Sequence, residues 1–146
     1  MYAKTSNGQL VKFPYNLLDL KKDHPNTSFP SDPSDSDLEA FEVYKVAASP
    51  VPEFDSKTHT VIQSVEQKDG IWTQTWQVAT LDQARASENV RAHRNRLLAE
   101  CDWTQLADSP LDADGKAAWA LYRETLRMIP QQAGFPWNVE WPPEPQ

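Results

Sequence analysis

The sequence predicts an α+β fold: a small N-terminal antiparallel β-sheet region, then an αα-hairpin and an extended Pro/Trp-rich C-terminal arm. Two turn signals, Asn7-Gly8 and Asp69-Gly70, each lie between segments of strand-like composition, which is typical of β-hairpins. From residue 81 the spacing of apolar residues becomes helical, and prolines cluster near the C-terminus. We therefore expect a β-rich domain over residues 1–80 and a helical domain over residues 81–146.

The first 40 residues predict one hairpin followed by a loop. Residues 2–5 and 10–13 flank the Asn-Gly turn and have the composition of two short strands. Residues 23–37 combine prolines with many Ser and Asp residues, so we expect an acidic loop there. The acidity of this segment indicates solvation rather than metal binding.

A second β-rich block follows the acidic loop. Residues 41–46 alternate apolar and charged side chains, as a half-buried strand does. Residues 58–66 and 71–79 surround the Asp-Gly turn and predict a second hairpin, and the side chains of Trp72 and Trp76 share one face. Together these segments predict one antiparallel sheet of about four to six short strands.

Two amphipathic helices are expected next, at about residues 82–101 and 112–129. The first has an apolar stripe and the second an apolar seam with Asp112 as N-cap, and Pro130 ends the second helix. A short connection between helices of this length favours an αα-hairpin. The stripe consists of Ala86, Val90, His93, Leu97 and Cys101, and the seam of Trp119, Tyr122, Leu126 and Ile129.

The segment from Gln131 to Gln146 contains too many prolines for a helix or a central strand. We expect an extended arm that carries Trp137 and Trp141. Exposed tryptophan is costly to leave in water. The two rings therefore either cover the chain's own helices or bind another chain, and the sequence leaves both alternatives open.

Charge and composition limit the possible partners. The chain has 21 acidic and 14 basic residues, for a formal net charge of −7, so general nucleic-acid binding is not expected. No segment is apolar enough for membrane insertion or for a signal peptide, and the single Cys101 excludes an internal disulfide. Arginines on the first helix form either a solvated face or a docking face for an acidic partner; they are Arg85, Arg91, Arg94 and Arg96.

No constellation for catalysis, metal or cofactor binding is present in the sequence. The histidines His24, His59 and His93 lack metal-ligand spacing, and the four glycines are too dispersed for a phosphate-binding loop. We therefore predict no catalytic residues, no metal, no cofactor and no enzymatic activity. Trp72 and Trp76 could form a stacking platform for a sugar or a single-stranded nucleic acid, but core packing is the favoured interpretation.

The C-terminal region resembles a known family, the bacteriophage tail assembly chaperones that accompany tail fibres. The resemblance covers about residues 82–145, with weaker similarity in residues 23–30 and 69–72. Its motif residues, in order, are Arg94-Asn95-Arg96-Leu97-Leu98, Cys101-Asp102-Trp103-Thr104-Gln105, residues 116–127, Ile129-Pro130-Gln131, Gly134-Phe135-Pro136 and Val139-Glu140-Trp141-Pro142. The chain departs from the pattern at Gly115, where a capping-box Glu is expected, and at Met128, where an acidic residue is expected.

The resemblance implies a non-enzymatic protein that binds a phage tail fibre or receptor-binding tip, which is expected to be trimeric, and assists its folding, trimerisation or attachment. The expected location is the host cytoplasm during assembly. Two alternatives are a structural tail-fibre or baseplate component retained in the virion tail, and a carbohydrate- or receptor-binding module. The candidate partner-binding residues are Trp103, Trp119, Tyr122, Arg123, Phe135, Pro136, Trp137 and Trp141.

Overall fold

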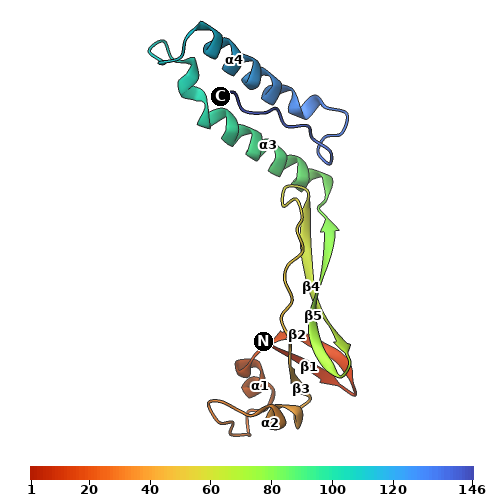
Figure 1. The fold of residues 1–146 in the computed structure, drawn as a ribbon. Helices are drawn as coiled ribbons and strands as arrows, with labels where there is room; N and C mark the ends of the chain where they lie inside the picture. Colours follow the sequence, from red (N-terminus) through yellow and green to blue (C-terminus); the bar gives the residue numbers. More distant parts are fainter. The chain divides into compact units, whose positions relative to one another are not determined.

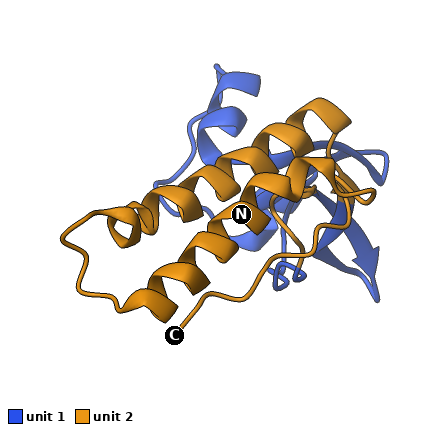
Figure 2. Cartoon of the chain, turned by 90° about the horizontal axis from the view of Figure 1, so that it is seen from above, with its two compact units in different colours: residues 1–53, 61–78 blue, residues 54–60, 79–146 orange.

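The computed structural model describes all 146 residues and has an α+β fold with antiparallel sheets and several helices, as the sequence predicts (Figure 1). The chain divides into two compact units (Figure 2). Unit 1 contains residues 1–53 and 61–78, and unit 2 contains residues 54–60 and 79–146.

Unit 1 begins with a three-stranded antiparallel sheet of order β2-β1-β3. Its strands are β1 (Tyr2–Ser6), β2 (Gln9–Tyr15) and β3 (Val43–Lys45). The turn between β1 and β2 is tight, because Ser6 pairs directly with Gln9. Asn7 and Gly8 both have positive φ, 52° and 75°, as a type I′ turn requires. This confirms the first predicted hairpin.

The second predicted hairpin is also confirmed. It consists of β4 (His59–Lys68) and β5 (Ile71–Thr80), joined at Asp69 and Gly70, whose φ angles are 50° and 81°. The expectation of one continuous sheet is wrong, because β4 and β5 form a separate two-stranded sheet. After β3, Ala47 forms one isolated parallel bridge with Thr73 of β5, and no strand of the first sheet pairs with β4 or β5.

Two short helices were not predicted, and they overlap the ends of the predicted acidic loop at residue 23 and at residues 35–37. They are α1 (Leu17–Asp23) and α2 (Asp35–Glu39), and each starts with a capping box. Asn16 caps α1 and Ser34 caps α2, in each case with an Asp three residues later that bonds back to the cap. Leu20 and Leu38 are the buried residues of these helices, and both join the core next to β3.

Unit 2 contains α3 (Gln83–Glu100), the 3-10 helix η1 (Asp102–Gln105), α4 (Ala113–Met128) and the 3-10 helix η2 (Ile129–Gln131). Asp82 caps α3 and Asp112 caps α4, each by accepting a backbone N–H three residues later. The predicted Asp112 cap is therefore confirmed. Since Gly115 has no side chain, the cap of α4 lacks the reciprocal half of a capping box.

The segment 54–60 belongs to unit 2 because it contacts the start of α3. The side-chain amide of Asn89 donates to the carbonyl oxygen of Lys57 (3.1 Å), and the amide of Leu81 donates to that of Thr58 (2.9 Å). Both carbonyl oxygens thus have hydrogen-bond partners, as polar backbone groups in a fold require. None of the helices has the length and apolar character needed to cross a membrane.

Candidate functional site

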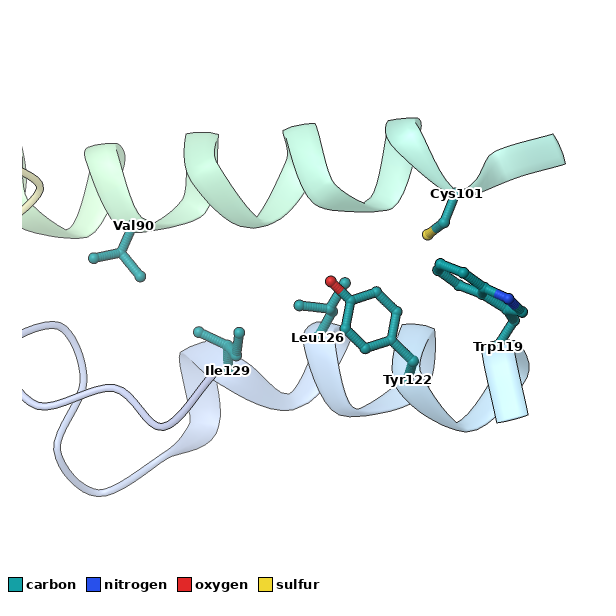
Figure 3. Packing of buried hydrophobic residues seen from close by; sticks show 6 residues of the cluster. All are labelled: Val90, Cys101, Trp119, Tyr122, Leu126 and Ile129. Atoms are coloured by element: carbon teal, nitrogen blue, oxygen red, sulfur yellow. The ribbon is translucent and has the colours of Figure 1, made fainter. Parts of the chain in front are cut away.

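The helices α3 and α4 share one apolar core, shown in Figure 3. Val90 of α3 and Cys101, the C-cap of α3, face the predicted seam, whose four residues in α4 and η2 are all less than one-tenth exposed. Val90 lies opposite Ile129 and Cys101 opposite Trp119, so the two helices run in opposite directions. The helical periodicity therefore identified the inward face of α4 correctly.

Four of the eight candidate partner-binding residues are buried in this unit: Trp119, Tyr122, Arg123 and Pro136. The ring of Trp119 packs edge-on against that of Tyr122, with 5.6 Å between the ring centroids. Burial of large aromatic rings contributes strongly to core stability. In this conformation these side chains are occupied mainly by contacts within the chain, and only Tyr122 also reaches the groove beside α4.

Arg123 is the polar centre of the helix pair. Its guanidinium donates to the carbonyl oxygen of Leu98 (2.7 Å), to Sγ of Cys101 (3.1 Å) and to the carboxylate of Asp102 (2.7 Å). The Arg123 side chain is only 9% exposed, whereas that of Asp102 is 67% exposed. The positive charge lies beside the last turn of α3, where unpaired carbonyls and the helix dipole favour a cation. Arg123 thus joins α4 to the end of α3.

Cys101, a residue of the predicted apolar stripe, is buried, with 2% of its surface exposed. Its thiol donates to the carbonyl oxygen of Leu97 (3.1 Å). The His93 ring is half-buried, and its Nδ1 accepts a hydrogen bond from the guanidinium of Arg96 (2.9 Å). Burial, followed by the charges of Lys57 and Arg96, holds the pKa of His93 below its ordinary value of 6.5.

The segment after α4 turns back along the helices (Figure 1). The turn closes through a hydrogen bond from the amide of Asn138 to the carbonyl oxygen of Gly134 (2.7 Å). The Gln132 side-chain amide then pairs with both backbone groups of Glu140, at 2.9 Å each. These contacts fix the direction of residues 132–140.

Two aromatic residues of this segment contact α3. The Trp141 ring packs edge-on against His93, with 4.6 Å between the ring centroids. The guanidinium of Arg91 lies 5.0 Å from the centroid of the Phe135 ring, within cation–π range. Both rings are half-buried against the α3–α4 core. In the structure, Trp141 therefore covers the chain's own helices.

Two candidate rings remain at the surface. Trp103 is 45% exposed and Trp137 is 42% exposed. Trp103 also packs on Trp119 at a centroid distance of 6.2 Å, so it links the surface to the core. The exposed candidates are therefore Trp103, in η1, and Trp137, in the turn after η2.

A groove that the sequence analysis missed lies between α4 and the C-terminal segment. Its volume is about 520 Å³, and one wall is the face of α4 that contains Leu121. Leu121 is 70% exposed and lies outside the buried core cluster. The opposite wall consists of Trp141, Pro142, Pro143 and Pro145. The sequence signal for this second face of α4 is the helical spacing of Ala118, Leu121 and Thr125, each one position before a seam residue.

The tryptophans of β5 have structural partners. Trp72 is 7% exposed and belongs to a core cluster with Val65. Trp76 is half-buried and its ring N–H donates to the carbonyl oxygen of Ser49 (3.2 Å). Both rings thus pack within unit 1, in agreement with the favoured interpretation of this strand. No group of three or more His, Cys, Asp or Glu side chains lies together in a metal-binding arrangement.

Unit 2 is thus a helix pair whose buried aromatic core is extended by a returning C-terminal segment. Residues 87–146 match the family model described as phage tail assembly chaperone protein. The resemblance seen in the sequence is confirmed over this range, which runs from the first turns of α3 to the last residue. The match supports a role in tail assembly. No curated protein and no solved structure matches the chain significantly.

Proposed function

We propose that this chain is a non-enzymatic tail assembly chaperone that binds a phage tail fibre or receptor-binding tip and assists its folding, trimerisation or attachment. The observation that carries the proposal is the family match over residues 87–146. The matched range includes most of α3, the whole of α4 and the C-terminal segment, which share one core. We assign partner binding to residues 81–146 and regard the helix pair with its arm as the binding unit.

A physical mechanism supports this assignment. Trimeric fibres consist of long β-structure that forms slowly, and their strand edges stay unpaired until all three chains close. Exposed edges and apolar surface in such intermediates lead to aggregation. A small partner with exposed apolar and aromatic side chains can cover that surface until the trimer forms. The net charge of −7 keeps such a partner soluble.

Among the eight candidate residues, we assign direct contact to the exposed Trp103 and Trp137. The buried residues Trp119, Tyr122 and Arg123 would stabilise the conformation of this binding surface, since each packs inside unit 2. Phe135, Pro136 and Trp141 would fix the returning segment. Aromatic residues are enriched at the centres of protein interfaces, which favours this choice.

Co-expression with the tail fibre protein of the same phage tests the proposal. We expect the two chains to co-purify, and we expect more soluble trimeric fibre than when the fibre is expressed alone. The fibre of an unrelated phage is the control and should not co-purify. If the cognate fibre neither binds this chain nor gains soluble trimer from it, the proposed function is wrong.

The chaperone is proposed to act in the host cytoplasm, and purified particles separate it from the alternative of a structural tail component. A chaperone that leaves after assembly should be absent from purified virions, whereas a retained cap should be present at a fixed ratio to the fibre. A carbohydrate-binding role has little support, because Trp72, Trp76 and Trp141 pack within the chain, which leaves Trp103 and Trp137 as the exposed tryptophans.

A further inference from the structure

The groove beside α4 is an apolar surface without an occupant in this chain. Its α4 wall contains Ala118, Leu121 and Thr125, which follow the spacing of one helical face. Leu121 has 70% of its surface exposed, more than any other large apolar side chain of the protein. A second apolar face on a helix whose first face is already buried is typical of an interaction surface.

The opposite wall is preorganised. Trp141 is held by the ring of His93, and Glu140 is held through its backbone by the amide of Gln132. Prolines at 142, 143 and 145 then restrict the backbone of the last residues. A wall that is already ordered loses little conformational entropy when a ligand binds, which favours affinity.

The charged groups at the groove are acidic. Glu140 is the only ionisable side chain among the lining residues other than Tyr122. Glu144 stands in the chain between Pro143 and Pro145, which both line the groove, so a second carboxylate lies beside it. No lysine or arginine lines it. A ligand that complements this surface has apolar side chains and at least one basic side chain.

We propose that this groove binds an apolar segment of the tail protein that contains a lysine or arginine, placed against Glu140 and Glu144. The inference rests on the proposed function and adds the position and chemistry of the binding site. A second copy of this chain is a poorer occupant. If two copies paired groove to groove, the acidic residues of one would face those of the other, and like charges across an interface are repulsive.

The decisive variant is Leu121→Glu, compared with Leu18→Glu as a matched control. Leu18 lies on helix α1 of unit 1 and is 69% exposed, against 70% for Leu121. Both substitutions place the same charge on a solvent-exposed helical position, so their effects on folding should be equally small. Circular dichroism of each variant checks this, and Leu121→Ser replaces Leu121→Glu if the latter does not fold.

Affinity for the co-purifying tail fibre protein is then measured by isothermal titration. We expect Leu121→Glu to weaken binding about tenfold or more, as at an interface hot spot, and Leu18→Glu to change it less than about twofold. Glu140→Lys combined with Glu144→Lys should weaken binding and reduce its salt dependence, since Glu140 keeps its backbone bonds to Gln132. Glu66→Lys on the exposed side of β4 is the charge control.

The outcomes separate the two proposals. If the unmodified chain binds the fibre and Leu121→Glu binds equally well, the groove is not the site and the proposed function stands. If the unmodified chain binds no fibre, the proposed function fails and this inference with it. If the unmodified chain is a dimer that Leu121→Glu converts to a monomer, the occupant is a second copy and the inference is overturned.

Discussion

Replacing Arg123 with Met tests whether this residue stabilises the helix pair or contacts a partner. The substitution keeps much of the apolar stem and removes three hydrogen bonds, to Leu98, Cys101 and Asp102. The bond to the Leu98 carbonyl has a charged donor, and such bonds contribute about 1.5–3 kcal/mol. The Asp102 carboxylate is 67% exposed, so its ion pair contributes about 1 kcal/mol or less.

One term opposes these losses. Nε of Arg123 is buried without a hydrogen-bond partner, and methionine removes that unsatisfied group. We therefore expect a net loss of about 2 kcal/mol in the free energy of unfolding. For a unit of this size, that loss corresponds to a fall of about 10 °C in the midpoint of thermal unfolding. Far-UV circular dichroism measures it directly, since α3 and α4 are the longest helices of the chain.

Asp102→Ala is the matched control for Arg123→Met. This substitution removes only the exposed ion pair, so we expect it to lower the free energy of unfolding by about 1 kcal/mol or less. Our reasoning is wrong if Arg123→Met lowers the free energy of unfolding no more than Asp102→Ala does. The hydrogen bond from Arg123 to the Leu98 carbonyl would then not stabilise the helix pair. If Arg123→Met leaves stability unchanged but abolishes fibre binding, Arg123 is a partner contact rather than a link between helices.

Three further substitutions test the packing and the titration of unit 2. Leu126→Ala, at a fully buried seam position, should lower the free energy of unfolding by about 2–5 kcal/mol in chemical denaturation, and a smaller loss would mean that the core is loosely packed. Gly134→Ala places a methyl group against the Asn138 carbonyl oxygen, so we expect lower stability and easier proteolysis of the last residues, whereas an unchanged cleavage rate would contradict the tight turn. Because the pKa of His93 is held below 6.5, the unfolded chain binds more protons than the folded chain, and stability should fall as the pH is lowered through 6.5. Burial and the charges of Lys57 and Arg96 lower this pKa, and Asp55 and Glu100 oppose them. In His93→Gln the fall in stability with pH, measured by urea unfolding, should be smaller. An identical pH profile would show that His93 is not the residue responsible.

Local signals predicted the elements that depend on neighbours in the sequence. Asn7-Gly8 and Asp69-Gly70 located both hairpin turns because only certain residues adopt positive φ at low cost. Asp112 located the start of α4 because its side chain accepts a nearby backbone amide. The short helices α1 and α2 were missed, although Asn16 and Ser34 each have an Asp three residues later, which is the signature of a capping box.

The partition into two sheets could not be predicted from local signals. Alternation over residues 41–46 indicates a strand but does not say which strand it pairs with. β3 pairs with β1, and Ala47, two residues after β3, forms a bridge with Thr73 of β5. Strand partners depend on contacts between residues far apart in the sequence, and the residues of one strand alone do not specify its partner.

The sequence by itself determined which residues of α4 face inward, because the 3.6-residue period places Trp119, Tyr122, Leu126 and Ile129 on one side of any helix they form. It also determined the family resemblance of the C-terminal region. Only the tertiary structure decided what surrounds each side chain. It placed Arg123 inside the fold and Trp141 against His93, and it left Leu121 exposed in the groove. Burial depends on how distant segments pack together, and periodicity within one segment does not specify that packing.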